Sequence, residues 1–175
     1  MPTTVVAAAI LIMGGIGAAP RESGAQATPS PKPSATAFDA CALVTKQEAA
    51  TAIGEAVGKP TPIGAGRPAM PGVNTGACEY QAATAPATLQ VYVWRFSDDS
   101  TGQFLRQRYE KGCARKERLS GLGEVACWYN SEHRELQVLK GTSFLIIRLT
   151  GRLKGDGNAT VVLTTLATKA LARLP

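Results

Sequence analysis

The sequence has 175 residues, of which 45% are hydrophobic, and it carries a formal net charge of +6 at pH 7. This length suits one domain with a hydrophobic core and argues against two domains. The positive surplus is modest, so either ordinary solubility or an anionic partner explains it, and we predict no nucleic-acid partner. With one histidine and no C-x-x-C spacing, the chain offers little for a zinc site.

The N-terminus has the features of an export signal. An apolar run at residues 5–13 is followed by small residues and by an A-x-A site that ends at Ala27. The run is too short for a membrane span, which needs about 20 residues. We therefore predict a signal peptide at residues 1–27, cleaved after Ala27. Residues 1–4 lack the usual Lys or Arg, and the alternative is a buried apolar N-terminal segment.

A tether is predicted between this signal and the folded domain. Residues 28–37 are rich in Pro, Ser and Thr and show no apolar periodicity, which favours an extended conformation. The single folded domain is therefore predicted to span residues 38–175.

The first helix is predicted at residues 46–57. Thr45 and Glu48 form a capping-box pattern at its start, and small or apolar residues recur behind them at helical spacing. Gly58, which lies shortly before a proline, is the predicted stop signal.

A long loop and a hairpin are predicted next. Residues 58–76 are rich in Gly and Pro, so we predict a loop that is either functional or disordered, with room for a short edge strand near Pro62. Residues 77–81 and 88–96 alternate as the two strands of a hairpin. Aromatic side chains on the second strand either line a ligand pocket or, as we favour, form core beneath a helix. They are Tyr92, Trp94 and Phe96.

A second helix is predicted at residues 101–116, after N-capping residues that include Asp99. Leu105, Tyr109 and Cys113 recur every four residues, which directs them towards the sheet. The other side carries an excess of positive charge, and it is either a solvated face or an anion-binding face. The candidate anion-binding residues are Arg106, Arg108, Lys111, Arg115, Lys116 and Arg118.

Residues 121–151 have the pattern of an antiparallel meander, with turns at residues 130–132 and 140–141. The last of its three strands, residues 143–150, is apolar on both faces, which predicts a central position with helices on at least one side. A final helix with an apolar stripe is predicted at residues 159–173.

Two parts of the sequence repeat each other. An Ala-Cys-x-Tyr motif begins at residue 77 and again at residue 126, and a Leu-Gln-Val motif follows each of them. Each also follows a predicted helix with a cysteine at or near one end. An even number of cysteines in an exported chain predicts disulfides. The repeat then predicts a doubled helix–hairpin unit and the pairs Cys41–Cys78 and Cys113–Cys127; the alternative is coincidence between short apolar strands.

Few residues in the sequence favour catalysis. His133 is the one histidine, and we expect it in an exposed turn, whereas nucleophilic catalysis needs a base held beside a nucleophile. The Gly-Leu-Gly sequence at residues 121–123 lacks the following helix of a nucleotide-binding fingerprint and predicts a tight turn. We therefore predict no catalytic residue, no metal and no cofactor.

Four short motifs along the chain have counterparts in a known group of proteins. They are the sequence CALVTKQEA at residues 41–49, ACEY at residues 77–80, GLGEVA at residues 121–126 and the closing Ala/Leu-rich helix. With these motifs the chain resembles the uncharacterised exported domains and small lipoproteins common in actinobacteria. The resemblance covers residues 38–174. It implies an envelope or secreted location and a helix-covered antiparallel sheet, and it brings no catalytic residues. The chain lacks a lipobox cysteine after its signal, because Cys41 lies well past the apolar run.

From these patterns we predict an α+β fold with an antiparallel sheet of about five strands, three covering helices and two disulfides. The predicted function is a secreted or cell-envelope, non-catalytic binding or sensor-like module. Its predicted partner is a protein of unknown identity or an anionic component of the envelope, through peripheral contact with membrane or wall. The alternative is an inhibitor of an extracellular enzyme that acts through residues 58–76, and the third function is a small hydrolase that uses His133.

Overall fold

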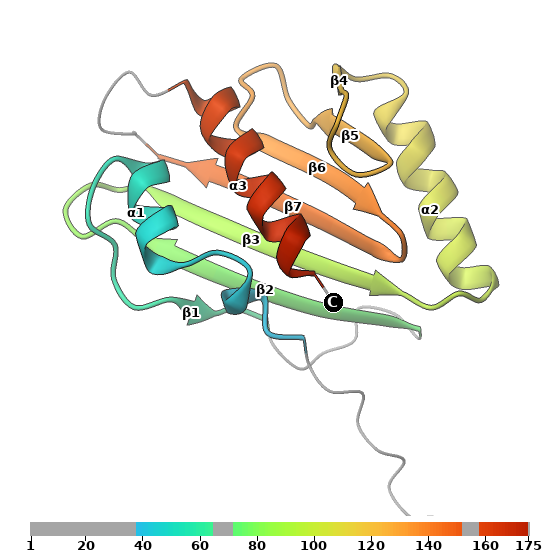
Figure 1. Ribbon diagram of the computed structural model, residues 1–175, viewed down its shortest axis with the longest axis horizontal. Helices are drawn as coiled ribbons and strands as arrows, with labels where there is room; N and C mark the ends of the chain where they lie inside the picture. The colour runs from blue at the N-terminus through green and yellow to red at the C-terminus, as the bar shows by residue number, and fades with distance from the viewer. Residues whose placement is uncertain (1–37, 65–71, 152–157, 175) are drawn as a thin grey trace, which may run out of the picture. The chain divides into compact units, whose positions relative to one another are not determined.

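The computed structural model describes residues 38–64, 72–151 and 158–174. Among these residues the chain forms a seven-stranded antiparallel sheet with the order β1-β2-β3-β7-β6-β5-β4 and three α-helices (Figure 1). The strands are β1 Thr61–Pro62, β2 Val73–Gln81, β3 Thr88–Phe96, β4 Arg118–Leu119, β5 Val125–Trp128, β6 Glu135–Lys140 and β7 Ser143–Thr150. The helices are a 3-10 turn, η1 Ala40–Ala42, and α1 Lys46–Ile53, α2 Ser100–Cys113 and α3 Ala159–Arg173.

Strand β7 lies at the centre of the sheet, as the sequence predicts. It pairs with β3 on one side and with β6 on the other, so that Leu145 is opposite both Val93 and Val138. Neighbouring side chains on both of its faces are buried, including Phe144 and Ile147. A strand that is apolar on both faces is stable only where both faces are covered.

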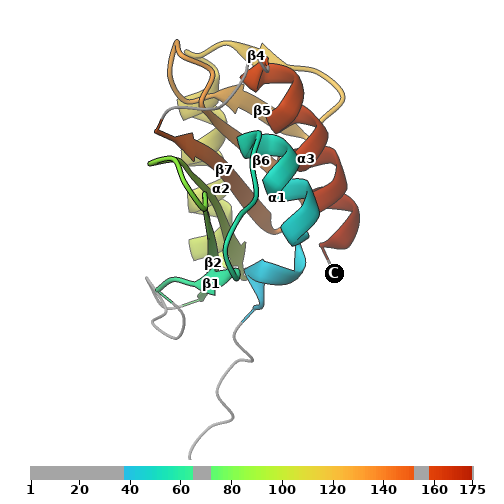
Figure 2. The same ribbon diagram turned by 90° about the vertical axis from the view of Figure 1, so that its left-hand side faces the viewer.

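The helices cover both faces of the sheet (Figures 1 and 2). Helices α1 and α3 lie on the face turned towards the viewer in Figure 1, here called the front face, and α2 lies on the opposite back face. The apolar stripe of α3 is buried on the front face, with Leu163, Ala167 and Ala170 fully covered. The predicted bounds of this helix are confirmed.

The aromatic row of β3 forms part of the core beneath α2. Trp94 meets Tyr109 of α2 edge to face, with ring centroids 6.3 Å apart, and Phe96 stacks on the same tyrosine at 6.2 Å. Leu105 of α2 joins Phe96 and Phe144 in this back core. For Trp94 and Phe96, the structure therefore agrees with core beneath a helix rather than with a ligand pocket.

Polar side chains cross the back face in a row over the strands. Register places Glu79, Gln90, Arg148 and Glu135 opposite one another on adjacent strands. Gln90 Nε2 donates to Glu79 Oε2 at 2.8 Å, and Arg148 Nε donates to Glu135 Oε2 at 2.6 Å. Because this row satisfies its own polar groups, the back face is stable with α2 as its one helix among the described residues.

Three predicted boundaries are wrong. Helix α2 ends at Cys113 rather than at residue 116, with Ala114 as its C-cap. The other two differ for local reasons. Helix α1 ends at Ile53 rather than at residue 57, because Gly54 adopts a left-handed conformation with φ 85° and caps the helix. Strand β2 begins at Val73 rather than at residue 77. Its Gly76 looks like a loop residue in the sequence, but a Cβ there would lie 2.3 Å from the carbonyl oxygen of Phe38.

Two short edge strands raise the strand number from the predicted five to seven. Strand β1 pairs with β2 near the predicted position of a short edge strand. Strand β4 pairs with β5 and was not predicted, because two residues cannot show alternation. The predicted tight turn before β5 is present, with positive φ at Gly121 and Gly123.

Both predicted disulfides are confirmed. The sulfur atoms of Cys41 and Cys78 are 2.07 Å apart, and those of Cys113 and Cys127 are 2.00 Å apart. Disulfides persist in oxidising, extracytoplasmic environments, so the two bonds indicate such an environment for this domain. None of the helices in the described part of the chain combines the length and the apolar character of a transmembrane span.

The topology agrees with a doubled unit. Helix α1 precedes edge strand β1 and the β2–β3 hairpin, and helix α2 precedes edge strand β4 and the β5–β6 hairpin. Strands β3 and β6 both run antiparallel to β7, so they are parallel to each other. A half-turn about an axis along β7 therefore relates the two units and exchanges the faces of the sheet. This explains why the first unit carries its disulfide on the front face and the second carries its disulfide on the back face.

Glu48 ties α1 to α3 on the front face. Arg173 binds its two carboxylate oxygens through two nitrogens, at 2.6 and 2.8 Å, and Lys169 Nζ lies 3.3 Å away. The carboxylate also accepts from the Thr45 backbone N–H, which completes the predicted capping box. The bonds from Arg173, and after them those from Thr45 and Lys169, outweigh burial and hold the pKa of Glu48 well below its ordinary value of 4.5.

We expect Glu48→Gln to lower the free energy of unfolding by about 2 kcal/mol at pH 7, because it leaves Arg173 without its charged partner. The pKa of Glu48 is lower in the folded protein than in the unfolded chain, so its ionised carboxylate stabilises the fold. This stabilisation is complete above pH 4.5 and declines as the pH falls below that value. Urea unfolding at pH 7 and pH 3 should therefore show a difference between wild type and variant that narrows in acid. Glu132→Gln, at a side chain that is 72% exposed, is the control with little expected effect. A difference that is constant with pH would contradict this account.

Candidate anion-binding face of helix α2

Helix α2 is held rigidly against the back face of the sheet. The Asp99 side chain accepts from the backbone N–H groups of Thr101 and Gly102, at 2.9 and 3.0 Å, and so caps the start of the helix. Leu105 is buried in the middle, and the disulfide from Cys113 fixes the C-terminal end to β5. The predicted orientation of Leu105 and Cys113 is confirmed. The opposite side of α2 is consequently turned to solvent.

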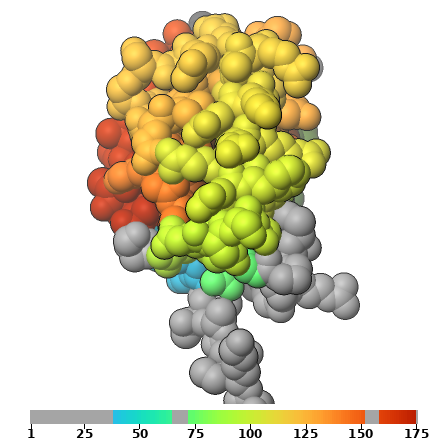
Figure 3. All heavy atoms as spheres, turned by 90° about the vertical axis from the view of Figure 1, so that its right-hand side faces the viewer, coloured from blue at the N-terminus to red at the C-terminus, as the bar shows by residue number. Residues whose placement is uncertain are grey.

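The outward side of α2 carries a shallow depression with a volume of about 390 Å³. Figure 3 looks at the side of the molecule on which α2, in yellow-green, lies. The residues that line the depression are three or four apart in sequence, as expected for one side of a helix. They are named here the basic face: Phe104, Gln107, Arg108, Lys111, Gly112 and Arg115.

The three cations of the basic face have no acidic partner among the residues that the structure describes. Arg108, Lys111 and Arg115 are exposed. The two acidic residues of this region bind elsewhere. Glu110 Oε1 lies 3.1 Å from Arg106 Nε, and Glu117 Oε2 lies 2.7 Å from His133 Nε2. The positive charge of the basic face is therefore uncompensated by these nearby carboxylates.

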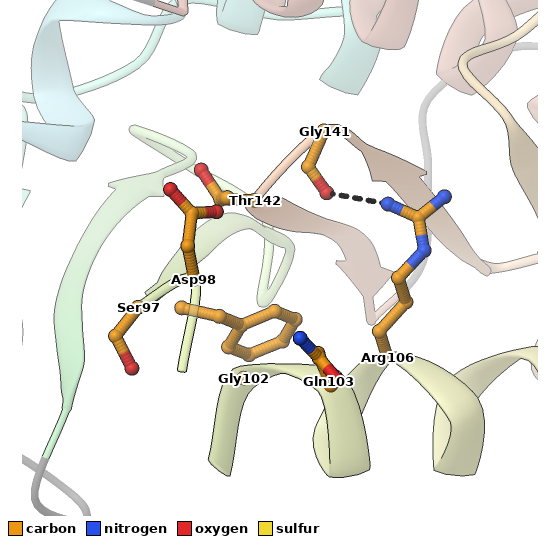
Figure 4. Close-up of a pocket in the computed structure, with 8 residues that line it drawn as sticks. Ser97, Asp98, Gly102, Gln103, Arg106, Gly141 and Thr142 are labelled. Carbon is orange, nitrogen blue, oxygen red and sulfur yellow. Dashed lines mark hydrogen bonds between the residues drawn. The ribbon is translucent and has the colours of Figure 1, made fainter. Parts of the chain in front are cut away.

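Arg106, a predicted anion-binding residue, is used inside the fold. It forms ion pairs with Glu110 and Glu124 and donates to the Gly141 carbonyl oxygen at 3.2 Å. Figure 4 shows this side chain extending from α2 to the β6–β7 turn, beside a hollow of about 310 Å³ that Asp98 also lines. The Gly141 N–H, 2.9 Å from Glu124 Oε1, and then Arg106 hold the pKa of Glu124 below its ordinary range.

The other two predicted cations lie away from the basic face. Lys116 Nζ lies 3.9 Å from the centre of the Tyr129 ring, a cation–π contact, and burial lowers the pKa of this lysine. Arg118 is exposed on edge strand β4. Of the six residues that the sequence groups together, the structure places three around one depression.

Three residues of the basic face, Phe104, Gln107 and Gly112, are absent from the predicted set. Phe104 is 62% exposed, and its signal in the sequence is an aromatic residue on the polar side of a helical pattern. A Cβ added at Gly112 would have no neighbour within 4 Å, so packing does not require a glycine there. Glycine inside a helix costs about 1 kcal/mol relative to alanine. Because Gly112 has no side chain, the depression is more open at this residue, and the helix is less stable by about that amount.

His133 lies between β5 and β6, as predicted, but it is more enclosed than expected. Its side chain is 31% exposed, its Nε2 binds Glu117, and its ring centroid is 5.1 Å from that of Trp128. These contacts fix the turn, in which His133 has a positive φ of 52°. The described part of the chain contains no group of three His, Cys, Asp or Glu residues that could hold a metal ion.

The segment predicted to act in an inhibitor is only partly described. Residues 65–71 lie outside the described residues. Of the rest, Thr61–Pro62 form β1, the Ile63 N–H donates to the Ala77 carbonyl oxygen at 3.0 Å, and Val73 begins β2. The predicted signal and tether, residues 1–37, also lie outside the described residues. No protein-family model, curated protein or solved structure matches this chain, so its resemblance to exported actinobacterial domains stays a prediction.

Proposed function

We propose that this protein is a secreted or cell-envelope, non-catalytic binding module that holds an anionic component of the envelope on the basic face of α2. One observation carries the proposal. Three exposed cations without acidic partners among the described residues surround a depression on a helix that a disulfide locks in place. An ordinary solvated face of a helix intersperses charges of both signs, whereas here the nearby carboxylates are bound elsewhere.

The chemistry of the basic face suits phosphate or carboxylate groups. A guanidinium group can donate two parallel hydrogen bonds to such an anion, and a lysine adds a compact positive charge. The gap at Gly112 allows an anionic group to approach the helix backbone between the three side chains. Because α2 is already ordered by its cap and its disulfide, binding costs no ordering of the backbone.

The proposed location supports an anionic envelope partner. The predicted export signal at residues 1–27 and tether at residues 28–37 agree with the oxidising environment that the two disulfides indicate. A basic surface in that compartment meets anionic wall polymers and lipid headgroups.

The test compares two variants with the same loss of charge. Arg108→Gln with Lys111→Gln removes two cations of the basic face, and Lys46→Gln with Lys59→Gln removes two exposed cations elsewhere. With about 0.7 kcal/mol for each exposed contact, the first variant should bind inorganic polyphosphate about tenfold more weakly than wild type. The control should bind like wild type, and added salt should weaken wild-type binding steeply. Equal losses in both variants would show that net charge alone binds the polyanion, and the proposal would be wrong.

A further inference from the structure

Phe104 differs from the other exposed large hydrophobic side chains of the described residues. Single exposed apolar residues are common on protein surfaces and need no explanation alone. Tyr129, however, is covered on one ring face by Lys116, and Val161 borders a groove where Lys169 is paired with Glu48. Phe104 instead shares the basic face with three cations that no described carboxylate pairs.

Phe104, Arg108 and Lys111 lie on one side of α2, and Arg115 lies in the turn two residues after the end of this helix. Phe104, Arg108, Lys111 and Arg115 follow the helical spacing of four, three and four residues. A flat surface that approaches this side meets all four side chains together when the helix axis lies parallel to it. At a membrane interface, Phe side chains enter the boundary between headgroups and acyl chains, and Lys or Arg side chains attract anionic lipids. The exposed side of α2 offers both kinds of side chain.

We propose, resting on the function proposed above, that the anionic component is the surface of an anionic phospholipid bilayer. In this arrangement the Phe104 ring enters the boundary between headgroups and acyl chains. Arg108, Lys111 and Arg115 contact the headgroup phosphates, one of which enters the depression at Gly112. A soluble wall polyanion would contact the cations equally well, but it would give the exposed phenyl ring no apolar partner. An anionic bilayer offers phosphate groups to the three cations and an apolar interior to the phenyl ring, so it fits the basic face better than a soluble polyanion does.

This contact is peripheral and reversible. Each basic side chain near an anionic bilayer surface strengthens binding by roughly fivefold. Burial of part of the phenyl ring adds roughly tenfold. Binding should therefore depend on anionic lipid and on salt, and the protein should leave the bilayer when salt is raised.

The experiment uses vesicles of phosphatidylcholine with phosphatidylglycerol and vesicles of phosphatidylcholine alone. Wild type should bind the anionic vesicles and not the neutral ones. Phe104→Ala should reduce binding to anionic vesicles roughly tenfold. Val161→Ala, at a valine on α3 that is 59% exposed, is the matched control and should bind anionic vesicles like wild type.

A second variant reports where residue 104 lies. The chain already contains Trp94 and Trp128, so the emission of Phe104→Trp is compared with that of wild type. The added indole should give extra emission that is blue-shifted on anionic vesicles and quenched by brominated acyl chains, which detect an indole within the bilayer. Polyphosphate binding without vesicle binding would overturn this inference and leave the proposed function standing. Vesicle binding that Phe104→Ala does not weaken, or an indole that brominated lipid does not quench, would also overturn it. Failure to bind either probe would overturn both proposals.

Discussion

Replacing both Cys41 and Cys78 with alanine is expected to lower the free energy of unfolding by about 4 kcal/mol. The bond joins residues that are 37 apart in sequence, so its loss releases a long loop in the unfolded chain. It also ties η1 to β2, where the Tyr80 hydroxyl donates to the Val44 carbonyl oxygen and to the Cys41 carbonyl oxygen. Urea unfolding of the variant and of wild type measures the difference.

The second disulfide supplies the control. Cys113 and Cys127 are only 14 apart in sequence, so the same alanine replacements should cost about 3 kcal/mol. Both pairs include a cysteine with no exposed surface, Cys78 in one and Cys127 in the other. Of their partners, Cys113 is 3% exposed and Cys41 is partly exposed, so alanine leaves a buried gap at three of the four positions. The main difference between the two variants is the length of the loop that each bond closes. A larger loss for the shorter loop would contradict this account.

Gly102→Ala is expected to lower the free energy of unfolding by about 3 kcal/mol, although alanine is the better helix former. A Cβ at residue 102 would lie 1.7 Å from the carbonyl oxygen of Ser97 and 3.2 Å from Phe96 Cβ. The first neighbour is backbone, so α2 must move away from β3 to relieve the contact. Thermal or urea unfolding checks the sign as well as the size of the change.

Gly112→Ala, on the same helix, should have the opposite sign. Nothing lies within 4 Å of a Cβ at residue 112, so alanine should stabilise the protein by about 0.5–1 kcal/mol through its helix propensity. If Gly102→Ala stabilised the protein as Gly112→Ala is expected to do, the account of a close contact at Gly102 would be wrong. A stabilising Gly112→Ala would also show that glycine is kept at residue 112 at a cost to the fold, as expected for a binding surface.

The candidate site was only partly visible in the sequence. Charge counting along the second predicted helix found the cations, and helical spacing placed Leu105 and Cys113 opposite them. The sequence pattern does not distinguish Arg106 from Arg108. The partners of Arg106 include Glu124 and the Gly141 carbonyl group, which are distant in sequence and come close to Arg106 only in the folded protein. Charge counting also missed Phe104, since one aromatic residue does not alter a polar pattern.

Predicted boundaries are wrong where a glycine is compatible with two different local structures. Gly54 and Gly58 are both acceptable stop signals, and only the left-handed conformation of Gly54 shows which one ends α1. Gly76 suggested a loop because its role depends on the Phe38 backbone, which lies far away along the chain. The two edge strands are too short to produce alternation, and they exist because longer neighbouring strands offer them hydrogen bonds.

The sequence by itself determined the fold class, the central position of β7, the bounds of α3 and the pairing of the cysteines. These properties follow from local periodicity, from capping residues and from a repeated motif, all of which can be recognised in the sequence. Only the tertiary structure decided which face each helix covers, and which cations are bound and which are exposed. Those properties depend on groups distant in sequence, such as Glu48 with Arg173 and Arg106 with Glu124, and burial and ion pairing arise only when folding brings such groups together.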